Sequence, residues 1–280
     1  MDYPGLIEAL REALRADERV SAVFLGGSRG RGDFDSHSDV DVVIGAETEH
    51  HGGLCADLPG IVASATDTVH SMRVGGLPVF TYITPDWLRF DVSISSASEL
   101  AGRRLAVLFD RSGTAADLAG EESAGLPGEA PAVLAGEAPV AGPDAVVVER
   151  LAREFLRVAG LLPVVVGRGE YVVGVAGFGL LHGMLIQLLR QTSTAADPGG
   201  VLSLRPLISV PDYEALESLP AVEASRVSVI DAHLACARQF LPLARRLHSE
   251  CGIDWPADMA EALRRHWRAT LDVELPLGEL

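Results

Sequence analysis

Lysine is absent from the 280-residue sequence, so all 23 cationic side chains are arginine. This absence excludes the lysine of a Walker-type phosphate loop, Schiff-base chemistry and a lysine general base. Cysteine is scarce as well, because only Cys55, Cys236 and Cys251 occur and they lie far apart in the chain. This spacing predicts neither a disulfide framework nor a thiolate metal site, and it favours a reducing, cytoplasmic compartment.

Positively charged residues are also fewer than negatively charged ones. There are 39 acidic residues against the 23 arginines, which leaves a formal net charge of −16. A chain of this sign is a poor candidate for sequence-independent binding to the phosphates of DNA or RNA, so we expect no nucleic-acid partner. A small neutral or cationic partner agrees better with the charge.

Long apolar runs are rare. One run, residues 171–189, is interrupted only by His182 and Gln187. Arg168 and Glu170 flank it on one side, and no aromatic belt or basic flank marks the other, so we expect a buried helix and no membrane partner. The first residues lack the basic and apolar regions of a secretory signal, which also favours a cytoplasmic protein.

The apolar side chains that are present, 48% of all residues, suffice for a sizeable core. The first 15 residues have apolar positions at helical spacing and predict an amphipathic helix. A mixed sheet with flanking helices is indicated over residues 1–112, because the strands follow this helix. Short runs rich in Val, Ile and Phe predict these strands at residues 20–25, 40–44, 77–83, 88–94 and 105–109, with a weaker one between Ile61 and Arg73.

The composition changes after this region. Residues 113–145 hold ten Ala, six Gly, four Pro and six acidic residues but no basic one, which predicts a linker. Residues 146–280 return to helical periodicity. Three apolar stripes and the run at 171–189 predict four helices, with Pro242 kinking or breaking the third. The expected fold class is therefore α+β, a mixed-sheet domain followed by an all-α helical bundle domain.

One segment combines the residue types of a phosphate site and a metal site. A Gly-Gly-Ser turn, beginning at Gly26, leaves the first strand and enters a short helix. The backbone N–H groups of Gly27 and Ser28 there suit an anionic phosphate. Ten residues later, Asp39 and Asp41 alternate along the next strand. Side chains two apart share one face of a strand, so this pair can hold one or two Mg²⁺ ions.

This order of Gly-Ser, ten residues and Asp-x-Asp resembles the signature of the nucleotidyltransferase superfamily to which DNA polymerase β belongs, in particular its antibiotic-modifying branch. A closer resemblance is to two-domain lincosamide nucleotidyltransferases. It is carried by four short segments in the same order along the chain, Asp17–Val20, Leu108–Gly113, Arg168–Tyr171 and Ser209–Tyr213. The resemblance implies a catalytic nucleotidyltransferase domain at residues 1–112 and a helical acceptor-binding domain at residues 146–280.

The activity that this resemblance implies is transfer of a nucleoside monophosphate from a nucleoside triphosphate (NTP) to a hydroxyl of a small molecule, with Mg²⁺ as cofactor and pyrophosphate as product. The superfamily has a third carboxylate on a later strand, and Asp91 matches it. Asp39, Asp41 and Asp91 are then the catalytic metal-site residues. Asp91 is either a further metal ligand or the general base that takes the hydroxyl proton. In the lincosamide branch the matching base is a glutamate.

The nucleotide contacts are expected at the Gly-Ser turn. Ser28 and the N–H groups of Gly27 and Ser28 would hold the terminal phosphates. Arg29 or Arg31 is the candidate for a charged contact to a phosphate.

Four residues of the helical domain are candidate acceptor contacts: Arg168, Glu170, Tyr171 and His182. Glu170, in the first turn of the apolar helix, could bind an amine of a cationic acceptor. Packing is the alternative role for Tyr171, and a hydrogen-bonded core position is the alternative for His182.

The acceptor stays open between a lincosamide-type or aminoglycoside-type antibiotic and a related biosynthetic metabolite. A function of another class, a protein-directed adenylyltransferase or antitoxin-like module, is disfavoured by the large helical domain. A catalytically silent relic is disfavoured because all three carboxylate positions are filled. A homodimer is compatible with the resemblance, although no residue requires it.

Overall fold

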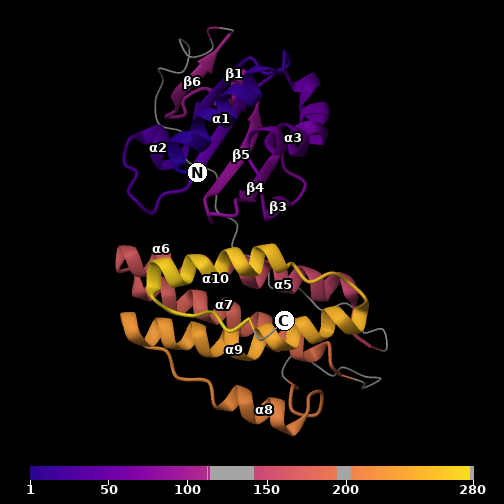
Figure 1. Ribbon diagram of the computed structural model, residues 1–280. Helices are drawn as coiled ribbons and strands as arrows, with labels where there is room; N and C mark the ends of the chain where they lie inside the picture. Colours follow the sequence, from indigo (N-terminus) through magenta and orange to yellow (C-terminus); the bar gives the residue numbers. More distant parts are fainter. Residues whose placement is uncertain (112, 114–141, 194–202, 278–280) are drawn as a thin grey trace. The chain divides into compact units, whose positions relative to one another are not determined.

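The computed structural model describes residues 1–111, 113, 142–193 and 203–277. The chain divides into two compact units, Met1–Ala132 and Val133–Leu280, which are treated separately below (Figure 1). The boundary falls within the predicted linker, and most of that linker lies outside the described residues.

The first unit contains a six-stranded mixed sheet with the strand order β3-β4-β5-β2-β1-β6. The pairing of β2 with β5 is parallel and the other four pairings are antiparallel. The strands are β1 (Ala22–Leu25), β2 (Val40–Gly45), β3 (His70–Arg73), β4 (Val79–Ile83), β5 (Arg89–Ser95) and β6 (Ala106–Asp110). The helices are α1 (Tyr3–Arg15), α2 (Gly27–Arg31), η1 (Thr48–His50), α3 (His51–Ala65) and α4 (Ala97–Leu100).

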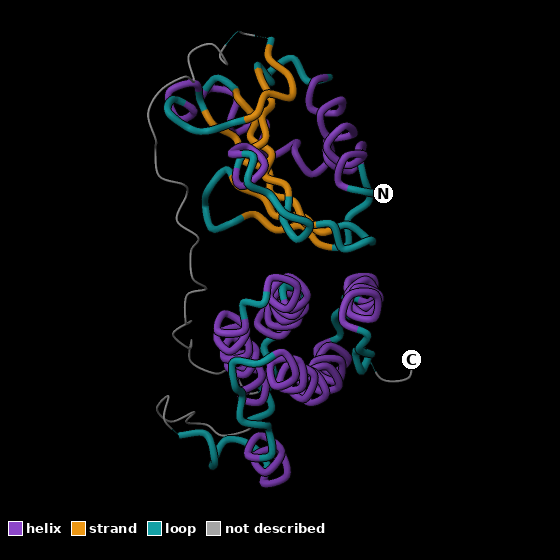
Figure 2. The backbone as a smooth tube through the Cα atoms, turned by 90° about the vertical axis from the view of Figure 1, so that its left-hand side faces the viewer, coloured by secondary structure: helices purple, strands orange, loops and turns teal. Residues whose placement is uncertain are grey.

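Helices α1 and α3 pack against each other and cover one face of this sheet (Figures 1 and 2). Their buried leucines, such as Leu10 and Leu58, form one core cluster with strand residues such as Val40, Val42 and Phe90. Burial of these side chains fixes the register, because a slip of one residue would turn every strand side chain to the other face. The acidic residues that alternate with them therefore lie on the opposite face of the sheet.

The five predicted strands of this unit are confirmed, and the sixth prediction is confirmed only in part. The weak strand expected between Ile61 and Arg73 is reduced to β3, because residues 51–65 form helix α3. The glycines and Pro59 in this segment concealed the helix, since both residue types disfavour helical backbone. Leu54, Leu58 and Val62 recur every four residues, and packing of this stripe against α1 stabilises the helix.

The described residues of the second unit contain helices and no strand. The four predicted helices are confirmed as α5, α7, α9 and α10, while the short helices α6 and α8 are additional to that prediction. Of the expected kink or break at Pro242, the break is wrong, because α9 continues through this residue and its neighbours Phe240, Leu241 and Ala244 are buried in the core. The six helices are α5 (Ala145–Ala159), α6 (Leu162–Arg168), α7 (Tyr171–Arg190), α8 (Val210–Glu217), α9 (Arg226–Cys251) and α10 (Ala257–Leu271).

Helix α7 is central to this second unit. It packs against α5, α6 and α9 through residues that include Gly174, Leu181 and Leu185. Among the described residues it is the one helix whose length and composition would allow it to cross a membrane. A third of its apolar stretch is buried, so the buried helix expected from the sequence is confirmed only in part. Gly174 marks a close approach, since a Cβ there would lie 2.6 Å from a methyl carbon of Val229 on α9.

Candidate active site

The Gly-Gly-Ser turn connects β1 to the short helix α2, as the sequence predicts. The N–H of Gly26 donates to the carbonyl of Asp41 at 2.8 Å, which ties the end of β1 to the start of β2. Helix α2 begins at Gly27 without a side-chain cap. The turn therefore presents its first backbone N–H groups beside the strand that carries the acidic pair.

Gly27 is in close contact with the carboxylate of Asp41. Its φ is +53°, in the left-handed region that favours glycine. A Cβ at this position would lie 1.8 Å from Oδ2 of Asp41, so even an alanine would displace the carboxylate. The second glycine of the motif thus allows the turn and the acidic strand to approach each other.

Two of the predicted carboxylates, Asp41 and Asp91, are neighbours on the face of β2 and β5 opposite to α1 and α3. Asp41 and Asp91 lie directly opposite each other in the parallel register, and Thr81 of β4 lies opposite Asp91 on its other side. Asp39 immediately precedes β2 and its side chain is 40% exposed. Two strands that are 50 residues apart in sequence thereby contribute to one acidic face.

Asp41 has a carboxyl with a raised pKa. Burial, first of all, and the negative charges of Asp39 and Asp91 together raise the pKa of its carboxyl from 3.8 to about 6. The positive charges of Arg31 and Arg89 oppose this rise. A half-buried carboxyl that is crowded by two others is a typical feature of a functional site.

Arg29 is held in place on several sides. Its guanidinium lies 4.9 Å from the ring centroid of Tyr3 and 4.7 Å from that of Phe34. Its Nε donates to the carbonyl of Asp39 at 3.0 Å, and its Nη2 donates to the carbonyl of Ser38 at 3.4 Å. The Arg29 side chain thereby fixes the backbone of Ser38 and Asp39, and so the position of the Asp39 carboxylate.

The other two arginines near the carboxylates have different partners. Arg31 forms an ion pair with Asp33 at 3.1 Å, and both side chains are exposed. Arg89, the first residue of β5, places Nη2 3.3 Å from Oδ2 of Asp39. Sequence reasoning missed Arg89, because its partner is 50 residues away and only the strand register brings them together.

The donor set of the acidic face suits a magnesium ion in kind, because it consists of carboxylate oxygens. The negative charges of Asp39 and Asp91 also repel that of Asp41, and a bound cation would neutralise this charge. Within the residues that the structure describes, no three His, Cys, Asp or Glu side chains are gathered closely enough to hold a metal ion. A ligand set of Asp39, Asp41 and Asp91 would therefore need their side chains to move closer together.

The candidate acceptor residues of the second unit fall into two places. Arg168 ends α6, Glu170 precedes α7 and Tyr171 begins it, so these three are neighbours, and the first two are exposed. His182 lies 11 residues further along α7, about 17 Å at the helical rise, and is not brought together with them.

His182 belongs instead to an aromatic cluster on α7 and α9. Its ring stacks on Phe178 with centroids 5.8 Å apart, and Phe178 also contacts the buried His233 at 6.2 Å. Burial lowers the pKa of both histidines. Sequence reasoning did not single out Phe178 or His233, although the four-residue spacing from Phe178 to His182 places those two on one helix face.

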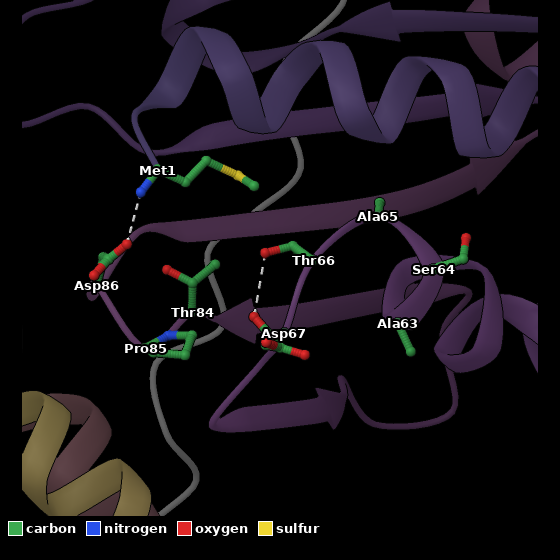
Figure 3. A pocket seen from close by; sticks show the side chains of 9 residues that line it. All are labelled: Met1, Ala63, Ser64, Ala65, Thr66, Asp67, Thr84, Pro85 and Asp86. Carbon is green, nitrogen blue, oxygen red and sulfur yellow. Dashed lines mark hydrogen bonds and ion pairs between the residues drawn. The ribbon is translucent and has the colours of Figure 1, made fainter.

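The first unit contains a pocket beside Met1 (Figure 3). The N-terminal ammonium of Met1 forms an ion pair with Asp86 at 2.8 Å, and both residues line the pocket (Figure 3). Its wall is formed by Met1, Ala63, Ser64, Ala65, Thr66, Asp67, Thr84, Pro85 and Asp86. None of the residues predicted to bind metal or nucleotide lines this pocket.

Comparison with solved structures shows a distant likeness. A crystal structure described as an aminoglycoside 6-adenyltransferase from Bacillus subtilis is 12% identical to this chain, with a TM-score of 0.42. The alignment covers 98% of this chain and 100% of that one. This similarity is too low to assign that protein's activity here. A search of the curated proteins found no match.

A protein-family comparison gives a clearer result. Residues 7–59 match the model of the nucleotidyltransferase domain, and the match includes the Gly-Gly-Ser turn, Asp39 and Asp41. The family description names no acceptor, so the lincosamide branch stays a prediction. The expected α+β fold class is confirmed. The matched residues cover part of the first unit, and the enzyme class expected from the sequence, a nucleotidyltransferase, is confirmed.

Proposed function

We propose that this protein catalyses Mg²⁺-dependent transfer of a nucleoside monophosphate from an NTP to a hydroxyl of a small molecule. The observation that carries the proposal is the convergence of Asp39, Asp41 and Asp91 on one sheet face beside the Gly-Ser turn of a nucleotidyltransferase domain. The hydroxyl oxygen attacks the α-phosphorus, the bond from that phosphorus to the bridging oxygen breaks, and pyrophosphate leaves.

Each carboxylate has a proposed role. Asp39 and Asp41 would hold Mg²⁺, which when bound neutralises charge on the triphosphate. Asp91 is either a third ligand or the base that accepts the hydroxyl proton. The register that sets Asp91 opposite Asp41 is compatible with both roles.

The Gly-Ser turn is the proposed site of the terminal phosphates. The backbone N–H groups of Gly27 and Ser28, at a helix start without a side-chain cap, and the hydroxyl of Ser28 would donate to phosphate oxygens. Arg31 remains a candidate phosphate contact. For Arg29 we propose a positioning role in place of the phosphate contact expected from the sequence, because its Nε and Nη2 already donate to backbone carbonyls.

Replacement of Arg29 by methionine tests this positioning role. The exchange removes the guanidinium that lies over the rings of Tyr3 and Phe34, and with it the hydrogen bonds to the carbonyls of Ser38 and Asp39. We expect kcat to fall by about tenfold, the cost of one or two hydrogen bonds, with little change in the KM for NTP. Arg29→Lys should restore part of kcat. A large rise in KM with unchanged kcat would instead assign Arg29 to phosphate binding.

The acceptor is proposed to be a small aminated molecule bound by the helical unit, residues 146–280, with residues 113–145 as the linker. An antibiotic of lincosamide or aminoglycoside type and a related biosynthetic metabolite both fit this description. The net charge of −16 favours a cationic acceptor, and Glu170 offers an exposed carboxylate for its amine. We further propose a cytoplasmic location. The resemblance to two-domain lincosamide nucleotidyltransferases leads us to propose a homodimer as well.

Replacement of Glu170 by glutamine tests the acceptor contact. The exchange preserves the shape of the side chain and removes its charge, so the KM for a cationic acceptor should rise by about tenfold while kcat changes little. Glu214→Gln on α8, an exposed residue with the same change of charge, is the control. An acceptor KM equal to that of the wild type in Glu170→Gln would remove Glu170 from the site.

The acceptor itself is tested by incubation with each of the four common NTPs, Mg²⁺ and a panel of aminoglycosides and lincosamides. Product mass and pyrophosphate release are measured. A nucleoside monophosphate adduct would identify donor and acceptor together. If labelled protein bands formed in a lysate and no small molecule was labelled, the acceptor would be a protein and the small-molecule proposal would be wrong.

A further inference from the structure

Arg89 has more hydrogen-bonding capacity than its surroundings use. A guanidinium carries five N–H donors. Among the described residues, the Arg89 side chain donates from Nη2 to Oδ2 of Asp39 at 3.3 Å. Its Nε is buried and has no hydrogen-bond partner there. The side chain is 20% exposed, so part of it is open to solvent.

The strand register explains why this arginine is at the site. Phe90 lies opposite Val40 and Asp91 lies opposite Asp41 in the parallel pairing of β5 with β2. One residue earlier, the same register sets Arg89 beside Asp39, as their ion pair requires. The acidic face thus consists of one cation–anion pair next to one anion–anion pair.

The other arginines near Asp41 are less suited to a new anionic partner. Arg29 is packed between two aromatic rings and donates to two backbone carbonyls. Arg31 ends a five-residue helix and is 47% exposed in its pair with Asp33. Arg89 is fixed by strand pairing, with Ile83 opposite it on β4, and its charge reaches both Asp39 and Asp41.

We infer that Arg89 is a ligand of the triphosphate of the bound NTP and that Asp39 holds this arginine until the carboxylate is engaged by a divalent cation. The inference rests on the proposed function and adds a phosphate-binding residue to it. A planar guanidinium matches two phosphate oxygens, and such charge-assisted pairs are among the strongest hydrogen bonds in proteins. The three carboxylates alone would repel the negatively charged triphosphate, and the positive charge of Arg89 would offset this repulsion.

The first test measures binding of inorganic tripolyphosphate by calorimetry in the presence of Mg²⁺. Because the probe has no base or sugar, it reports the phosphate contacts alone. Arg89→Gln should weaken binding by about ten- to a hundredfold, the worth of a hydrogen bond to a charged group. Arg89→Lys should weaken it less, since the charge remains. Arg73→Gln on β3, whose arginine donates to the carbonyl of Leu77, should bind as the wild type does.

The second test removes the competing partner and omits the divalent cation. With EDTA present, Asp39→Asn should raise tripolyphosphate affinity, because Arg89 is released. In the Arg89→Gln background the same exchange should give a much smaller gain. An equal gain in both backgrounds would show that Asp39→Asn only removes charge repulsion, and this would overturn the inference.

Failure of the inference can be told apart from failure of the proposed function. Binding of tripolyphosphate by Arg89→Gln within twofold of the wild type overturns the inference, and so does an absence of binding by the wild type. If Arg89 proves essential for binding but the wild type transfers no nucleotide from any NTP, the inference holds and the proposed function is wrong.

Discussion

Replacement of Asp41 by asparagine is expected to stabilise the metal-free protein at neutral pH and at the same time to slow nucleotidyl transfer severely. The two effects have one origin. Burial and the charges of Asp39 and Asp91 raise the pKa of Asp41 to about 6, so the ionised form that a metal ion needs is unfavourable in the folded protein. Asparagine resembles the neutral acid and avoids this cost.

The direction of the pH dependence follows from the raised pKa. The native protein keeps a proton on Asp41 between pH 3.8, the unperturbed value, and about 6, whereas the unfolded chain loses it. The stabilising contribution of this group is therefore complete below pH 3.8 and is lost as the pH rises through about 6. The groups that set the shift beyond burial are Asp39 and Asp91, which raise it, and Arg31 and Arg89, which oppose it.

The stability measurement is urea unfolding of wild type and Asp41→Asn from pH 4 to 8 without divalent cations. The difference should be near zero at pH 4 and should favour the variant by about 1–3 kcal/mol above pH 6, since one pKa unit corresponds to about 1.4 kcal/mol. Added Mg²⁺ should raise the Tm of the wild type only, because ligand binding stabilises the folded state. Asp231→Asn, at an exposed position on α9, should change neither property.

The same variant should lose turnover by on the order of a thousandfold, the size of the loss when a preorganised electrostatic group is removed. A destabilised Asp41→Asn protein would show that the carboxylate makes favourable contacts when ionised. Full activity would remove Asp41 from the catalytic machinery.

The second large effect is expected at Gly27, where alanine should cost about a hundredfold in kcat. A Cβ would lie 1.8 Å from Oδ2 of Asp41, so this carboxylate has to move. A displacement of about 1 Å at a catalytic group is enough for such a loss. The positive φ of +53° adds a backbone cost of about 1 kcal/mol.

Gly32 provides a matched control for this backbone cost. Its φ is +79°, and a Cβ there would meet no atom within 4 Å. Gly32→Ala should therefore be destabilised by a similar amount while keeping its activity. Equal kcat values in the two alanine variants would contradict the proposed role of the contact between Gly27 and Asp41.

Much of the first unit could be predicted because its information is local. Strand residues such as Val40 and Val42 alternate with Asp39 and Asp41, so periodicity gives both the strand and the face that carries the acids. The short helix after the Gly-Gly-Ser turn could be predicted because the signal for it is also local. Pairing between distant segments is a different matter. The parallel contact of β2 with β5, which sets Asp91 opposite Asp41, depends on a crossover through α3, β3 and β4.

The arginines show the same limit in the site itself. Arg29 belongs to the motif, and its charge indicated a phosphate contact. The aromatic rings and the backbone carbonyl that contact Arg29 belong to α1 and to the loop before β2. Spacing in the sequence does not reveal these contacts. Arg89 gave no signal, because an arginine two residues before Asp91 is ordinary on a strand. Its meaning depends on Asp39 lying beside it in the folded sheet.

The central claim is that the carboxylates of β2 and β5 catalyse nucleotidyl transfer. The most direct test compares the wild type with the double variant Asp39→Asn/Asp41→Asn in one assay of pyrophosphate release and acceptor mass, with Mg²⁺ and the NTP that the wild type prefers. We predict an adduct and pyrophosphate with the wild type, and neither product with a double variant that remains folded by circular dichroism. Substantial transfer by the folded double variant would contradict the account.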